Sequence, residues 1–262
     1  MRQALRRAGD VATVAWLSYR ALFTWLNPVG YVANRLVQPV AVATLYGVFV
    51  SELTGRTFPT LVGTAVLALA SAMMFGISMA IANERQFGTL EMWIASPQTF
   101  VAGLLARAVP HVVDGVLAAV LSLGTSMLVF HVSVPAAYFL VAVPAFAVIA
   151  YSVTGASLLL AAYAVWSRDS LGGPNVFKLV LTVCTGSVVA VSLLPVRLFG
   201  LPALLPLTAG QQAAKEALIA GRLDGGSLVR ELVVGTVYLA LGSGAIAWAF
   251  RRVRVSGLVA FR

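Results

Sequence analysis

The chain has 262 residues, of which 60% are hydrophobic and only 10% are charged, and its mean hydropathy is +0.93. This composition excludes an ordinary soluble domain, in which about a quarter of the residues carry a charge. The formal net charge of +9 does not indicate nucleic-acid binding, because the basic residues are dispersed at the ends of apolar runs instead of gathered on one soluble face.

The apolar runs predict an all-α integral membrane protein that forms a single domain over residues 1–262. Six runs can supply a transmembrane helix, at about residues 29–50, 60–82, 98–130, 136–165, 176–194 and 228–250. Basic residues are more numerous in the parts that this order places inside, which predicts that both termini are cytoplasmic. The composition, rich in alanine, valine and arginine, suggests a bacterial source and hence a bacterial inner membrane.

Residues 1–27 mix apolar side chains with arginines, which predicts an amphipathic helix on the cytoplasmic membrane surface. The first span then carries Arg35 and Gln38 near its start. An arginine in a span is costly, so Arg35 is expected to snorkel to the surface, to form an ion pair or to face a polar cavity. Both residues are candidates for a transport pathway or for a structural polar cluster.

Residues 84–97, with the sequence ERQFGTLEMWIASP, interrupt two long apolar runs with a charged and amphipathic stretch. Gly88 is expected to end the incoming helix in a left-handed conformation, and Thr89 to cap a short new helix that has Glu91 in its first turn. Any membrane protein with several spans can have an interfacial turn of this kind.

A helical wheel over the same stretch gives it two distinct faces. Phe87, Leu90 and Ile94 lie together, and Glu84 and Glu91 lie beside them. The carboxylates are expected to meet basic groups on a partner protein or on the N-terminal surface helix.

The pattern Glu-Arg-x-x-Gly-Thr-Leu-Glu, followed by a short apolar helix and Ser-Pro, resembles the first cytoplasmic loop of type-2 ABC transporter permeases. In that family this loop is the coupling helix, which contacts the ATPase subunit. The resemblance implies this role for Glu84, Arg85, Phe87, Gly88, Thr89, Leu90, Glu91 and Ile94.

Arg107, His111 and Asp114 are spaced i, i+4 and i+7 in the third span, which places them on one face of a helix. Such a set could relay protons, contact a substrate or form a structural charge cluster. The structural interpretation is favoured, because the family resembled often has a basic residue where Arg107 stands.

Residues 195–227 form neither a clean span nor a polar loop, since Pro195, Pro202 and Pro206 divide them into short pieces. A surface helix is predicted over residues 207–219. Pro-Leu-Thr followed by Glu-Ala-Leu resembles the outer re-entrant segment that precedes the last span in type-2 ABC permeases, although Gln211 and Gln212 depart from the expected apolar helix start.

The resemblance implies a permease subunit of an ATP-driven exporter for an amphipathic substrate such as a drug, a lipid or a lipopeptide. The chain has no Gly-x4-Gly-Lys-Ser/Thr loop, so we expect ATP and Mg²⁺ to be bound by two copies of a separate ATPase, with a second permease completing a dimer, most simply a homodimer. We expect no catalytic residue, no metal ligand and no bound nucleic acid in this chain.

Two other classes of function remain open at this point. A secondary transporter, driven by an ion or proton gradient, would use His111 and Asp114, but the two halves of the chain show no repeat. A membrane-embedded enzyme would need convergent reactive groups, whereas the two histidines and Cys184 lie in different parts of the chain.

Overall fold

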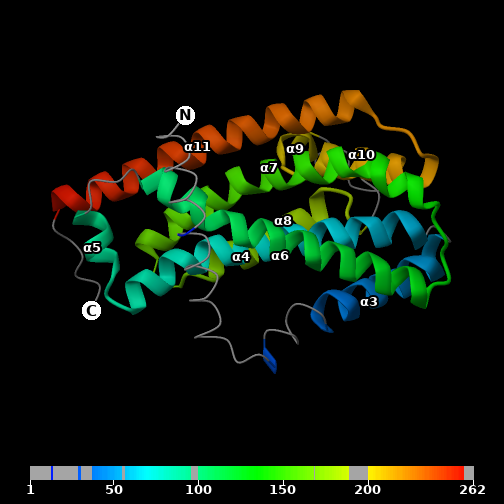
Figure 1. The fold of residues 1–262 in the computed structure, drawn as a ribbon, viewed down its shortest axis with the longest axis horizontal. Coiled ribbons are helices and arrows are strands. Elements are labelled where there is room, and N and C mark those ends of the chain that lie inside the picture. Colours follow the sequence, from blue (N-terminus) through cyan, green and yellow to red (C-terminus); the bar gives the residue numbers. More distant parts are fainter. Residues whose placement is uncertain are drawn as a thin grey trace.

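The computed structural model describes residues 13, 29–30, 37–54, 57–95, 100–167, 169–188 and 200–256, and in these residues it has helices and no strand (Figure 1). The helices are α3 (Gln38–Thr54), α4 (Thr57–Gln86), α5 (Leu90–Ala95), α6 (Phe100–Val129), α7 (Ala136–Trp166), α8 (Gly172–Cys184), α9 (Gly200–Leu204), α10 (Thr208–Ala220) and α11 (Gly225–Ser256). The predicted surface helix of residues 1–27, apart from Thr13, and Arg35 lie outside the described residues.

Four of these helices, α4, α6, α7 and α11, are long and apolar enough to cross a membrane. Each has 30 to 32 residues, or roughly 45 Å at 1.5 Å per residue, which exceeds the hydrocarbon thickness of about 30 Å. The all-α, multi-pass architecture is therefore confirmed. The count of six spans stays a prediction, because the described parts of α3 and α8 are shorter.

The predicted fifth span, residues 176–194, is wrong as a continuous helix. Its helix, α8, ends at Cys184 after 13 residues, and the next residues bend at Gly186, which has a φ of +81°. The carbonyl groups freed at this bend accept hydrogen bonds from side chains of α10, so the backbone can leave the helix without unpaired polar groups.

The long helices lie side by side along the long axis of the molecule (Figure 1). Helix α7 packs mainly against α11 and α4, and α4 packs against α6 and α3. The short helix α5 lies at the left end of the view, whereas α10 lies toward the right end (Figure 1). The two interruptions that the sequence predicted, at residues 84–97 and 195–227, are thus far apart along the bundle.

Glycines set the close contact between α7 and α11. A Cβ atom on Gly155 would lie 2.4 Å from the backbone nitrogen of Leu239, and one on Gly242 would lie 2.6 Å from the carbonyl oxygen of Gly155. Gly242 of α11 therefore packs directly against the backbone of α7.

Replacing Gly155 by alanine is expected to separate α7 from α11 and to lower the free energy of unfolding by about 1–3 kcal/mol, because neither backbone can yield to the added methyl group. Thermal unfolding in detergent micelles measures this effect.

The control for Gly155→Ala is Gly124→Ala in α6, where an added Cβ meets nothing within 4 Å. Alanine is the better helix former, so this variant is expected to unfold at the original temperature or slightly above it. Equal unfolding temperatures for the two variants would contradict the glycine-mediated packing.

Candidate functional site

Helix α4 ends in the turn that the sequence predicted. Gly88 has a φ of +70°, and its amide donates a hydrogen bond to the carbonyl of Arg85 at 3.2 Å. The amide of Thr89 donates to the carbonyl of Glu84 at 2.9 Å. These bonds satisfy carbonyl groups at the end of the helix, which is the usual role of a left-handed C-terminal glycine. The prediction for Gly88 is confirmed.

Thr89 begins the short helix α5, although its side chain has a different role from the one predicted. The amide of Trp93 donates to the carbonyl of Thr89 at 3.1 Å, so Thr89 is the residue before the helix, and Glu91 is in the first turn as predicted. The Thr89 hydroxyl, however, donates to the Glu84 carboxylate and does not cap an amide of α5. The hydroxyl thereby connects α4 with the start of α5.

Glu84 forms an ion pair with Arg107 of α6. Their side chains are only 19% and 21% exposed, so the pair is largely shielded from water. The expectation that Glu84 meets basic groups of a partner or of the surface helix is therefore wrong. That expectation treated residues 84–94 as one helical surface. It did not include the packing of α4 against α6, which brings the side chains of Glu84 and Arg107 into contact.

The predicted apolar stripe of α5 is divided for the same reason. Because the chain turns at Gly88, Phe87 lies 58% exposed in the turn while Leu90 is buried at 5% exposure. Glu91 and Met92 are also exposed. The side chain of Ile94 lies outside the described residues. Among the residues whose side chains are described, Phe87, Glu91 and Met92 form the outward surface of the turn. Leu90, which the prediction placed beside Phe87, is not part of this surface.

Trp93, which the sequence analysis did not single out, fixes α5 to the bundle. Its ring lies edge-on to Phe100 of α6 and Phe250 of α11, at centroid distances of 5.8 Å and 5.6 Å. Phe100 and Phe250 stack on each other at 4.1 Å. The guanidinium of Arg107 lies 4.3 Å from the centroid of the Trp93 ring, a cation–π geometry. The Thr89-Leu90-Glu91-Met92-Trp93 spacing, which puts an aromatic residue opposite Glu91, was the available signal.

Arg85 contributes a second connection from the end of α4. Its guanidinium donates to the backbone carbonyl of Ser167, at 2.6 Å, just after α7 ends. A cation is favourable at this negative end of a helix dipole. Neighbouring residues Glu84 and Arg85 thus connect α4 to two different helices, α6 and α7.

His111 and Asp114, the other two members of the predicted polar set, are each 2% exposed. The imidazole of His111 lies directly over Gly76 of α4, because a Cβ on that glycine would approach the ring nitrogen to 2.2 Å. His111 therefore faces α4, as Arg107 does, which is the side that the spacing predicted. Arg107, the third member of the set, forms a structural ion pair with Glu84.

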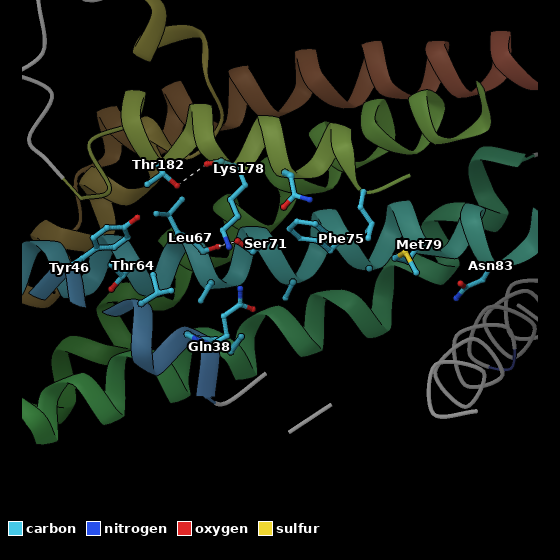
Figure 2. Close-up of a pocket in the computed structure, with 18 residues that line it drawn as sticks. Gln38, Tyr46, Thr64, Leu67, Ser71, Phe75, Met79, Asn83, Lys178 and Thr182 are labelled. Carbon is cyan, nitrogen blue, oxygen red and sulfur yellow. Dashed lines mark hydrogen bonds between the residues drawn. The ribbon is translucent and has the colours of Figure 1, made fainter. Parts of the chain in front are cut away.

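A cavity of about 470 Å³ lies between α3, α4 and α8 (Figure 2). Its walls follow one face of each helix, and the face of α8 carries Asn175, Lys178 and Thr182 at helical spacing. Gln38, one of the predicted pathway residues, lines it from α3. Neither His111 nor Asp114 is among its lining residues.

At the other end of the bundle, side chains hold α10 in place. The carboxylate of Glu231, in α11, accepts hydrogen bonds from the amides of Leu207 at 2.8 Å and Gly210 at 3.0 Å. Gly210 is in the first turn of α10, and Leu207, the residue before this helix, has a left-handed φ of +80°. Glu231 therefore caps α10 from a neighbouring helix and offsets the strain at Leu207.

Two side chains of α10 connect this helix to the bend after α8. The amide nitrogen of Gln211 donates to the carbonyl of Thr185, and the ammonium of Lys215 donates to the carbonyl of Gly186 at 2.7 Å. Burial lowers the pKa of Lys215 to about 8. Gln211 departs from the apolar helix start that the resemblance led us to expect. The structure explains this departure, because the side-chain amide of Gln211 pairs with the backbone where the chain bends after α8.

These features define a multi-pass membrane protein whose helix ends are tied by charged and polar side chains. The family model described as ABC-2 type transporter matches residues 13–219, which is most of the chain. The chain belongs to this family, and it is an ABC-type permease domain and not an ATPase. Membrane subunits of this family typically work with ATPase partners. No curated protein matches the chain.

The Glu84–Arg107 pair is tested by a double-mutant cycle with Glu84→Gln and Arg107→Gln. Because the pair is charged, hydrogen-bonded and largely shielded, we expect a coupling energy of about 1–2 kcal/mol, above that of an exposed ion pair. Chemical unfolding in detergent micelles gives the four stabilities.

The matched control is the cycle of Glu91→Gln with Arg107→Gln, since Glu91 is exposed on α5. Its coupling energy is expected to be close to zero. A coupling as large for Glu91 as for Glu84 would contradict the assigned pair.

Proposed function

We propose that this chain is the membrane subunit of an ATP-driven exporter, and that it forms the path for an amphipathic substrate such as a drug, a lipid or a lipopeptide. Two copies of the chain, or one copy and a sister permease, pair with two ATPase subunits. ATP and Mg²⁺ are bound by those subunits. The complex lies in a bacterial inner membrane with both termini of this chain in the cytoplasm.

The observation that carries the proposal is the outward surface of the turn after α4. Phe87 and Met92 are 58% and 69% exposed, and Glu91 lies between them in sequence. Apolar side chains beside a carboxylate suit a protein partner, because the apolar groups supply contact area and the charge supplies orientation. Residues 84–97 also carry the resemblance to a coupling helix.

The packing of α5 explains how a partner could act on the transport path. The inward side of this helix is held by Trp93 against α6 and α11, and Glu84 ties the same turn to Arg107. Helix α4, which leads into the turn, lines the cavity from Thr64 to Asn83. A push on the turn is therefore expected to move α4, and with it one wall of the cavity.

The main alternative, a transporter driven by protons through His111 and Asp114, has less support. Both residues are buried between helices and neither lines the cavity. A proton relay that drives transport would be expected to reach the transport path. We therefore favour ATP-driven export.

Cysteines at positions 87 and 92 test the contact with the ATPase, in a background in which Cys184 is replaced by serine. Phe87→Cys and Met92→Cys are expected to crosslink to cysteines on the ATPase, because both positions are exposed at the predicted cytoplasmic end. Leu128→Cys, 77% exposed at the opposite end of α6, is the control and should give no crosslink. Crosslinks that form only through the loop after α7, for example at Asp169, would show that another segment is the main coupling element.

Glu91→Gln tests the charge on the outward surface. We expect insertion and stability to remain, since Glu91 is exposed, while transport and the stimulation of ATPase activity fall several-fold. Glu52→Gln, an exposed carboxylate at the end of α3 remote from the turn, is the matched control. Transport by the Glu91 variant at the original rate would remove the coupling role of this carboxylate.

A further inference from the structure

We propose that the cavity between α3, α4 and α8 binds an amphipathic anion, whose charged head meets Lys178 and whose apolar tail lies along α4. This inference deepens the proposed function by naming a class of substrate, and it rests on that function only in assigning the bound molecule to transport. Binding itself requires neither the ATPase nor ATP.

The charge of the lining residues indicates that the ligand is an anion. Among the 18 lining residues, all in the described part of the chain, Lys178 is the one charged residue and none is acidic. An ammonium group inside an apolar bundle is costly unless an anion or several polar groups compensate it. A bound anion would supply this compensation, whereas a cationic ligand would be repelled.

The polar groups around Lys178 are placed to receive such a head. Lys178 points from α8 into the cavity, toward the side from which Ser71 of α4 and Gln38 of α3 approach (Figure 2). The Gln38 amide can donate a hydrogen bond to a phosphate, sulfate or carboxylate, and the Ser71 hydroxyl can do so once it releases its bond to the Leu67 carbonyl. Asn175, one turn before Lys178 on the same face of α8, adds a second amide.

The length of the cavity indicates that the ligand has an apolar tail. Its lining follows α4 from Thr64 to Asn83, a length of roughly 28 Å at 1.5 Å per residue. Beyond Ser71, the wall toward the cytoplasmic end is formed by Phe75 and Met79 (Figure 2). A small inorganic anion would occupy the polar part alone and would leave this apolar part unfilled. The volume of about 470 Å³ lies within the range of sites for small organic ligands.

The choice of lysine at this position is not explained by folding. The other lysine of the chain, Lys215, donates to the carbonyl of Gly186 and so connects two segments. Lys178 has no ion pair with an acidic side chain among the described residues, and its ammonium is directed into the cavity. Removal of its charge is therefore expected to spare the fold while it weakens the binding of an anion.

The proposal is tested with dodecyl phosphate that carries a diazirine on its tail, and with the same diazirine tail on neutral maltoside. The full chain is placed in nanodiscs of phosphatidylcholine, irradiated, and digested to locate the label. We expect the phosphate probe to label residues 64–83, and Lys178→Gln to reduce this labelling at least about tenfold, the effect of one charged hydrogen bond. Labelling by the maltoside probe should not change with this variant.

Three controls make the result specific. Lys178→Arg retains the charge and is expected to keep most of the labelling, and Arg222→Gln removes an exposed charge from the loop after α10 and should change nothing. Millimolar inorganic phosphate should not compete, since it has no tail. Unchanged labelling of Lys178→Gln, equal labelling of residues 64–83 by the maltoside probe, or full competition by inorganic phosphate would each overturn the proposal.

The thermal unfolding of Lys178→Met separates a binding role from a structural one. Without a probe this variant should unfold at the original temperature or above it, because a partly buried ammonium has been removed. Dodecyl phosphate should raise the unfolding temperature of the original chain and of Lys178→Arg only. Destabilisation of Lys178→Met together with unchanged labelling would make Lys178 a structural residue. If the phosphate probe labels the cavity as expected but residues 84–97 form no crosslink to an ATPase, the coupling role of residues 84–97 is refuted and the proposed binding site is retained.

Discussion

The ion pair between Glu84 and Arg107 is the interaction on which the end of the bundle that carries α5 depends. Two charges that are about four-fifths shielded from water are stable only as partners, so α4 and α6 must keep their relative height. Arg107 also lies over the ring of Trp93, and Trp93 packs on Phe100 and Phe250. A single guanidinium therefore joins α4, α5, α6 and α11. The inward side of α5 is thereby held against the bundle, while Glu91 and Met92 remain exposed.

The end of the bundle that carries α10 solves the same physical problem with backbone groups in place of an ion pair. Where the backbone bends after α8, the carbonyl groups of Thr185 and Gly186 accept hydrogen bonds from Gln211 and Lys215 of α10. The amides at the start of α10 are in turn satisfied by Glu231. Between these two ends the helices meet through small residues such as Gly155 and Gly242, which form no directional bonds. Position is thus set by directional bonds at the ends and by close backbone packing in the middle.

The sequence predicted what depends on local chemistry and missed what depends on the pairing of helices. The left-handed turn at Gly88 and the place of Glu91 follow from residues within one turn, and both are as predicted. The partner of Glu84 could not be predicted, because Arg107 reaches it only through the antiparallel register of α4 and α6. The early end of α8 was missed for a similar reason: its apolar run continues in sequence, and the groups that permit the bend come from α10. The cavity is lined by residues of α3, α4, α6 and α8, and it depends on how these helices pack. For this reason the sequence pointed only to Gln38 among its lining residues.

The two lysines of the chain show why location alone does not decide the role of a charge in an apolar bundle. Both extend from helices that have few charged neighbours, and both lose hydration when the bundle forms. Lys215 recovers part of the lost free energy from the Gly186 carbonyl, and in doing so it closes the bend after α8, so folding accounts for it. Lys178 faces a cavity whose wall offers hydroxyl and amide groups but no carboxylate. An anion that enters the cavity, as proposed above, would compensate the charge of Lys178. Because α4 forms one wall of that cavity and also leads into the turn at Gly88, the same helix links the bound molecule to the surface that a partner would reach.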